Sequence, residues 1–314
     1  MLQNLGRQLA HLLQRRRLFL AVSLGLALGG LNYYVLVSAN WRGDMWLAYC
    51  GAQRILTGEN PFECPRDGNW PAYPLTTAIV FLPLLGLPLP VASGVMVGLV
   101  TGVCAYVLNR PSETWRLLAF ISVPLLYAVI TAQWAPLFLA AALAPTLYPT
   151  ILLKPQFGLP IGLMHFTWRR VMLTGVLGLS TFLFRPTWLG EWLAQVSTYD
   201  GFIPLLTLPL GPALLLAAWR WRRPEACWLL LTALMPQRLW YDQLLLWVIP
   251  RTGWQMATLT LGSWLTFLPF LLWQDTTPTW TMLFLYLPSL GLVFWQTHQD
   301  ELLTQTTQPT TPST

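Results

Sequence analysis

Long apolar runs that do not alternate with polar residues dominate the chain. The first is "LFLAVSLGLALGGLNYYVLV", within about residues 18–38. A membrane-spanning strand would alternate with period two, whereas a spanning helix needs roughly 20 consecutive apolar residues. The pattern therefore predicts an all-α, polytopic transmembrane helical bundle.

Later apolar runs are often too short for a simple span, so we expect half-helices, hairpins or tilted pairs broken at proline. The expected number of crossings is nine to eleven. The runs lie at about 75–89, 92–108, 117–132, 134–153, 156–168, 171–184, 204–219, 226–236, 239–250, 254–272 and 280–296.

Three other segments flank or interrupt the membrane domain, which we place at 18–298. Residues 1–17 carry leucines at helical spacing and predict a cytoplasmic interfacial helix. Residues 39–74 form the longest polar segment, the first external loop. Residues 299–314 end in "TQTTQPTTPST" and predict a disordered cytoplasmic tail.

The first external loop contains its own helical pattern. Apolar residues follow Gly43-Asp44 at helical spacing, Gly58 is placed to end the helix, and Asn60-Pro61 turns the chain. We expect an amphipathic helix on the outer membrane surface. Asp44 at its first turn is either an ordinary N-cap or a carboxylate able to take a proton from an acceptor hydroxyl.

Composition supports a membrane protein, since 55% of residues are hydrophobic and 10% are charged, whereas soluble proteins have about a quarter charged. The 18 tryptophans suit the headgroup region. The net charge of +6 comes from short arginine clusters between apolar runs. These clusters are typical of cytoplasmic anchors, not of a nucleic-acid groove.

The arginine clusters also predict orientation in the plasma membrane. With Arg15–Arg17 and both termini cytoplasmic, alternation places Asp44 and a second group outside: Lys154, Arg185, Glu191, Asp200, Arg238, Asp242 and Asp275. It leaves Arg110 and Arg116 outside as an exception. Alternatively, one short run is re-entrant and the side of Gln133 changes.

Cysteines and histidines give little chemistry. Cys50 and Cys64 share the external loop and either form a disulfide or remain two small apolar residues. The three histidines are scattered without partners at metal spacing, so we expect no metal site and no cofactor.

Lys154 is the only lysine beside 17 arginines, and it stands in the apolar stretch "ILLKPQFGLP". An ammonium is costly in hydrocarbon. Lys154 either pairs with an anionic phosphate at the membrane boundary or is a lysine that extends from a helix end to the headgroups.

Several spaced motifs resemble glycosyltransferase family 87. "GDMWLAYCGAQRILTGENPF" followed by "YPLTTAIVFLPLLGLPLP" resembles the start of that family. "TAQWAPLFLAAAL" resembles its Gly-Gln step, with Ala132 in place of glycine. "LLKPQFGLPIGLMHFTWRR" resembles its Lys-Pro segment, and "MPQRLWYDQLLLWVIP" resembles its late proline-containing loop.

The resemblance implies a GT-C fold and an inverting transfer of a mannose-like hexose from a polyprenyl-phosphate-linked donor to an extracytoplasmic lipid or glycan acceptor. Asp44 would be the general base, and Lys154 and Arg238 would bind the donor phosphate. The expected substrate-binding residues are Tyr49, Tyr73, Gln133, Gln156, Tyr241 and Asp242. The competing hypothesis is a non-enzymatic membrane protein, either a lipid-carrier transporter or an assembly scaffold.

Overall fold

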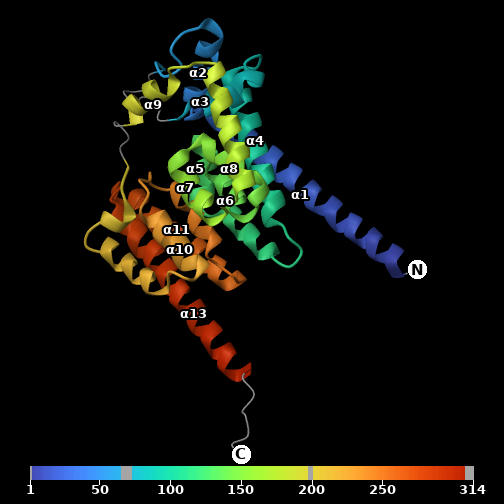
Figure 1. The fold of residues 1–314 in the computed structure, drawn as a ribbon, viewed down its shortest axis with the longest axis vertical. Coiled ribbons are helices and arrows are strands. Elements are labelled where there is room, and N and C mark those ends of the chain that lie inside the picture. Colours follow the sequence, from blue (N-terminus) through green and yellow to red (C-terminus); the bar gives the residue numbers. More distant parts are fainter. Residues whose placement is uncertain (1, 65–72, 197–200, 308–314) are drawn as a thin grey trace, which may run out of the picture.

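The structure is a computed structural model that describes residues 2–64, 73–196 and 201–307. These residues form helices and connecting loops without strands, apart from one isolated antiparallel bridge between Phe202 and Gln237. The all-α prediction is confirmed (Figure 1). In chain order the elements are α1 (Leu2–Ser38), α2 (Met45–Thr57), α3 (Leu75–Phe81), η1 (Leu82–Leu84), α4 (Leu89–Leu108), η2 (Thr114–Ile121), α5 (Val123–Thr131), α6 (Ala135–Leu143), η3 (Pro145–Leu153), α7 (Pro155–Met164), α8 (Trp168–Ser180), η4 (Thr181–Leu183), α9 (Trp188–Val196), η5 (Pro204–Leu206), η6 (Gly211–Arg220), α10 (Pro224–Ala233), η7 (Asp242–Val248), α11 (Gly253–Trp273), α12 (Pro278–Thr281), η8 (Met282–Tyr286) and α13 (Leu287–Thr307).

Among the described residues, four helical stretches are long and apolar enough to cross a membrane: Gln14–Ser38, Leu89–Leu108, Gly253–Trp273 and Pro278–Thr304. The pair η2 and α5 is a fifth candidate, bent by 59° at its break. The other apolar runs form shorter helices, many with 3₁₀ geometry. The expectation of short and broken helices is therefore confirmed, whereas the nine to eleven expected crossings exceed the four or five candidate spans of the described residues.

Helices α1 and α4 meet along a seam of small residues. A Cβ added at Gly29 would lie 2.4 Å from the carbonyl oxygen of Gly94, and one at Gly25 would lie 2.6 Å from that of Gly98. Because hydrocarbon provides no hydrophobic force between helices, such close backbone approach is what joins them. The order of these contacts makes the two helices antiparallel.

The antiparallel seam defines two ends of the bundle. At the arginine end, Arg17 of α1 donates a hydrogen bond of 2.8 Å to the carbonyl of Tyr106, near the end of α4. At the Asp44 end, α1 finishes at Ser38 and the chain enters α2. In Figure 1, α2, α3 and α9 gather at the Asp44 end, and α13 extends from the opposite side of the molecule.

The prediction that Arg110 and Arg116 lie on the Asp44 side is wrong. Arg110 follows α4 at the arginine end and donates to the carbonyl of Leu143 at 2.7 Å. Helices α3 and η1 cover only residues 75–84, and Thr76 donates to the carbonyl of Leu152 next to Lys154, so the chain stays at the Asp44 end until α4. Gln133 lies at the Asp44 end, where its side chain donates to Asp44, and the re-entrant alternative stays a prediction.

Two boundary predictions also differ from the structure. Helix α1 runs unbroken from Leu2 to Ser38, so no separate helix ends at residue 17. Helix α13 continues to Thr307, where a disordered tail was expected, and residues 308–314 lie outside the described part. The tail prediction is therefore wrong for residues 299–307, where Asp300 and Glu301 pair with arginines 223, 251 and 220.

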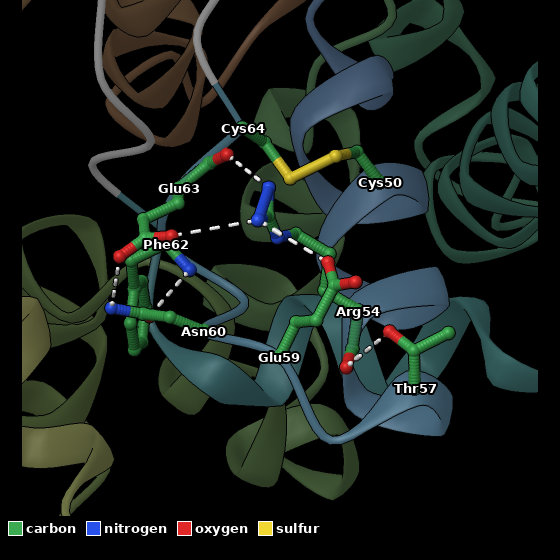
Figure 2. Close-up of a disulfide and its surroundings, with 8 residues drawn as sticks. All are labelled: Cys50, Arg54, Thr57, Glu59, Asn60, Phe62, Glu63 and Cys64. Carbon is green, nitrogen blue, oxygen red and sulfur yellow. Dashed lines mark hydrogen bonds and ion pairs between the residues drawn. A yellow bond between two sulfur atoms is a disulfide. The ribbon is translucent and has the colours of Figure 1, made fainter.

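The expected helix of the external loop is present as α2, with Gly58 ending it in the left-handed conformation (φ 74°). Cys50 and Cys64 form a disulfide, which resolves the open alternative (Figure 2). Arg54 lies beside it and pairs with Glu59 and Glu63 at 3.2 and 3.4 Å. Residues 65–72 of this loop lie outside the described part.

Candidate functional site

The break between helices α5 and α6 lies at the centre of the Asp44 end. Helix α5 ends at Thr131, and Ala132 follows in the left-handed region with φ 58°. This conformation costs roughly 1–2 kcal/mol for a residue with a Cβ. It also turns the chain so that Gln133 leaves the helix axis. The left-handed backbone explains why glycine suits this position in the motif that the sequence resembles.

Asp44 is held by this break. Its backbone amide donates to the carbonyl of Thr131 at 3.1 Å, and Gln133 donates a side-chain hydrogen bond to its carboxylate oxygen Oδ2. Tyr73 in turn donates to Oε1 of Gln133 at 2.9 Å. Tyr73 and Gln133, both expected site residues, are thus brought to the carboxylate.

The N-cap interpretation of Asp44 fails in one respect. Asp44 precedes α2, but its side chain makes no capping hydrogen bond and its backbone is helical (φ −76°, ψ −19°). A working N-cap residue has extended backbone and accepts from the second or third helical amide. The side chain accepts a hydrogen bond from Gln133 and not from the amides of α2, and Asp44 remains partly exposed.

Lys154 and Asp242 form a buried ion pair. The ammonium Nζ lies 2.9 Å from Oδ1 of Asp242, and the two residues are 5% and 3% exposed. The rings of Phe157 and Tyr241 lie 4.2 and 5.2 Å from the ammonium. Lys154 does not extend to the headgroups, so that interpretation is wrong. Its neighbours replace hydration with a carboxylate and two aromatic faces.

Arg238 lies at the same loop as Asp242. Its backbone amide donates to Oδ2 of Asp242 at 2.7 Å, and the residue is half-buried. The ammonium of Lys154 lies over the ring of Tyr241, which stacks on Tyr127 of α5, and the last carbonyl of α5 binds the amide of Asp44. Asp44 and Lys154, which are far apart in the sequence, therefore lie at the same end of the bundle.

Sequence reasoning missed an aromatic cluster beside Asp44. Trp240 contacts Tyr127, Phe267 and Phe270, with ring centroids 5.2, 5.5 and 4.7 Å away. Trp240 has φ 72°, a strained conformation for a bulky residue. Tyr127 also stacks on Tyr241 at 6.2 Å. The adjacent "WYDQ" was a sequence signal for this loop, but nothing in the sequence marked Tyr127.

Two expected site residues lie outside this group of contacts. Tyr49 is buried and donates to the carbonyl of Leu87 at 2.9 Å, which ties α2 to the start of α4. Gln156 is half-buried in the first turn of α7, and no hydrogen bond of its side chain is found within the described ranges. In the structure Tyr49 packs α2 against the start of α4, and Gln156 stands in the first turn of α7.

The described residues contain no group of three or more His, Cys, Asp or Glu side chains that could hold a metal ion. The chemistry available is a partly exposed carboxylate oriented by an amide, next to fixed positive charge and aromatic faces. No protein-family model, curated protein or solved structure matches the chain. A function for this protein therefore has to be inferred from the geometry of the Asp44 end.

Proposed function

We propose that the protein is a membrane glycosyltransferase of the GT-C type. It transfers a hexose from a polyprenyl-phosphate-linked donor to an extracytoplasmic acceptor with inversion, and Asp44 is the general base. The observation that supports this most is the position of Asp44: a partly exposed carboxylate held by Gln133 at the same end as Lys154, Asp242 and Arg238.

The two carboxylates of the site, Asp44 and Asp242, differ in how accessible they are to an acceptor hydroxyl. A general base must be within reach of the acceptor hydroxyl, which a fully buried carboxylate is not. Asp242 is 3% exposed, and its two oxygens are taken by Lys154 and by the amide of Arg238. Asp44 is accessible by comparison. The acceptor hydroxyl therefore approaches Asp44.

The leaving phosphate requires positive charge that stabilises it as the bond to the sugar breaks. Because Lys154 is 5% exposed and paired with Asp242 at 2.9 Å, whereas Arg238 is half-buried, we assign the direct phosphate contact to Arg238. Lys154 then acts mainly through Asp242, which it holds in place against the backbone of Arg238. This refines the expectation that Lys154 itself binds the phosphate.

Two features at opposite ends support the proposed side of the membrane. Disulfides persist in oxidising compartments, and Cys50–Cys64 lies in the loop that begins at Asp44. Arginines favour the cytoplasmic side, and Arg17, Arg110 and Arg251 lie at or near the other end. We therefore place the site on the outer face of the plasma membrane, with both termini in the cytoplasm.

The test is a transfer assay with purified protein, radiolabelled polyprenyl-phospho-mannose or polyprenyl-phospho-glucose, and lipid or glycan acceptors. Asp44→Asn keeps the shape of the side chain and should lower turnover about 100-fold or more, the usual contribution of a general base. Glu59→Gln, which changes an exposed carboxylate at the same end, is the matched control. Unchanged turnover in Asp44→Asn would remove Asp44 from the mechanism.

A lipid-carrier transporter is the second candidate, because buried ionisable pairs in apolar bundles also occur on transport pathways. The Lys154–Asp242 pair is the observation that favours it. Proteoliposomes loaded with labelled polyprenyl-phospho-sugar separate the two functions. Movement of intact label between leaflets indicates a carrier, whereas label transferred to the acceptor indicates a glycosyltransferase.

A further inference from the structure

Asn32 is a polar residue in the apolar helix α1, and it is completely buried (0% exposed). Its Nδ2 donates to the carbonyls of Val129 and Ile130 at 2.8 and 3.3 Å. Its Oδ1 accepts a hydrogen bond of 2.9 Å from the hydroxyl of Ser93 in α4. A buried amide of this kind is costly unless its groups are paired, and here both are paired.

The two carbonyls that Asn32 binds belong to the last turn of α5, just before the break at Ala132. The last four carbonyls of a helix have no partner within it and need one elsewhere, above all in an apolar interior. The amide of Gln133 bonds to the carbonyl of Ala128 at 2.7 Å, and the amide of Asp44 bonds to that of Thr131 at 3.1 Å. The carbonyl of Val129 accepts the amide of Ala132 at 3.3 Å, and Asn32 adds a second, shorter bond there. Asn32 also supplies a partner for the carbonyl of Ile130.

The local sequence accounts for only part of this break. Pro136 explains why a new helix begins near residue 135, because proline suits the first turn of a helix. It does not explain why α5 ends at Thr131 or why Ala132 adopts the costly left-handed conformation. No glycine stands between Pro124 and Pro136 to favour that turn. The stabilising contact comes from α1 and α4.

We propose that Asn32 and Ser93 are positioning residues that fix the end of α5 and thereby hold Gln133 against Asp44. Their effect on catalysis depends on the proposed function, but their effect on the break does not. Asn32 gives hydrogen bonds to the α5 carbonyls, Ser93 holds the Asn32 side chain in that orientation, and the left-handed Ala132 aims Gln133 at the carboxylate.

Hydrogen exchange followed by mass spectrometry tests the structural part without any activity. The variant Asn32→Leu keeps the size of the side chain and removes its hydrogen bonds. Leu28→Ala is the matched control, because Leu28 lies one turn earlier on α1, packs against the core and makes no such bonds. Ser93→Ala is the milder variant in case Asn32→Leu folds poorly.

Asn32→Leu should raise exchange about tenfold or more in peptides that cover the amides of Asp44 and Gln133, with exchange in α11 unchanged. Ser93→Ala should give a smaller rise in the same peptides. In Leu28→Ala, exchange in these two peptides should rise no more than exchange in the rest of the bundle. Equal loosening everywhere in both Asn32→Leu and Ser93→Ala, or no change at 44 and 133, would overturn the proposal.

Transfer kinetics then test the catalytic consequence. Asn32→Leu should lower kcat about tenfold or more with little change in KM for the donor, since misplacing a catalytic group by 1 Å can cost 100-fold. Local loosening without a kcat effect, in a protein that does transfer sugar, contradicts the positioning role. If the wild-type protein transfers no sugar, the proposed function fails, and the exchange result still decides whether Asn32 holds the break.

Discussion

A buried ion pair at the Asp44 end contrasts with the exposed pairs that hold α13 at the arginine end. The side chains of Lys154 and Asp242 are only 7% and 2% exposed. The pairs around α13 have side chains that are 19–43% exposed: Arg220–Glu301, Arg223–Asp300, Arg251–Glu225 and Arg251–Asp300. Exposed pairs contribute about 0–1 kcal/mol each, whereas a buried pair must first overcome the loss of hydration.

The exposed pairs and the buried pair therefore have different roles. The arginine end fastens α13 to the ends of neighbouring elements with contacts that water can replace. A buried pair is weak evidence for stability, since well-packed apolar residues would often serve as well. The pair at the Asp44 end coincides with a strained Trp240, a left-handed Ala132 and the Asp44 carboxylate. That coincidence is the reason to assign function there.

The largest expected effect comes from breaking the buried pair. Lys154→Ala leaves Asp242 buried without a partner and should lower the free energy of unfolding by about 3–5 kcal/mol. Arg223→Ala should cost less than about 1 kcal/mol. Thermal unfolding in detergent, compared at equal protein concentration, measures both. Equal losses in the two variants would remove the contrast between the ends.

The next effect concerns the disulfide, which is found at the Asp44 end. Replacing Cys50 and Cys64, which are 14 residues apart, by serine should cost about 3 kcal/mol. The expected loss should appear as earlier proteolysis within α2 and a lower melting temperature. Cys227→Ser is the control, because Cys227 is a free cysteine. A loss of the same size in Cys227→Ser would contradict this assignment.

The seam between α1 and α4 runs from one end of the bundle towards the other. Gly29 lies in this seam and the adjacent Gly30 does not, so the two glycines form a matched pair for mutation. Gly29→Ala places a methyl group against the Gly94 backbone and should cost about 1–3 kcal/mol. A Cβ at Gly30 meets no atom within 4 Å, so Gly30→Ala should have little effect or stabilise α1 slightly. Melting temperatures of the two variants test this directly. Similar values for both would argue against a close seam.

The smallest effect tests whether burial or location decides the strength of an ion pair. Arg185 and Glu191 pair at 2.6 Å at the Asp44 end but are partly exposed. A hydrogen bond from Arg185 lowers the pKa of the Glu191 carboxyl. The pair therefore stabilises the fold above the unfolded pKa of about 4.3, and this contribution is lost as pH falls through the lowered folded value.

Glu191→Gln should remove that pH-dependent contribution, which we expect to be below about 1 kcal/mol, as at the arginine end. Melting temperatures of wild type and variant should differ slightly at pH 7 and converge near pH 3. A difference that persists at low pH would show that Glu191 stabilises the fold by packing instead of by charge.

The long apolar helices, α2 and the short broken helices were predictable because hydrophobic period and helix-ending residues act locally. The positions of Arg110 and Arg116 were not, because the run at 75–89 is long enough for either a tilted span or a hairpin. Only its contacts with Leu152 and with the α2–α4 region decide between them. The seam glycines were visible at four-residue spacing, but their partners were not.

For the candidate site, the sequence by itself determined an aspartate after the first helix, from its place before a helical pattern, and a lone lysine in apolar surroundings, from composition. Only the tertiary structure decided that Asp44 meets Gln133, that Lys154 pairs with Asp242 and that Asn32 supports the break at Ala132. These contacts join residues about 60 to 100 positions apart. Buried polar groups must find partners wherever the fold provides them, and no local pattern records which helix will do so.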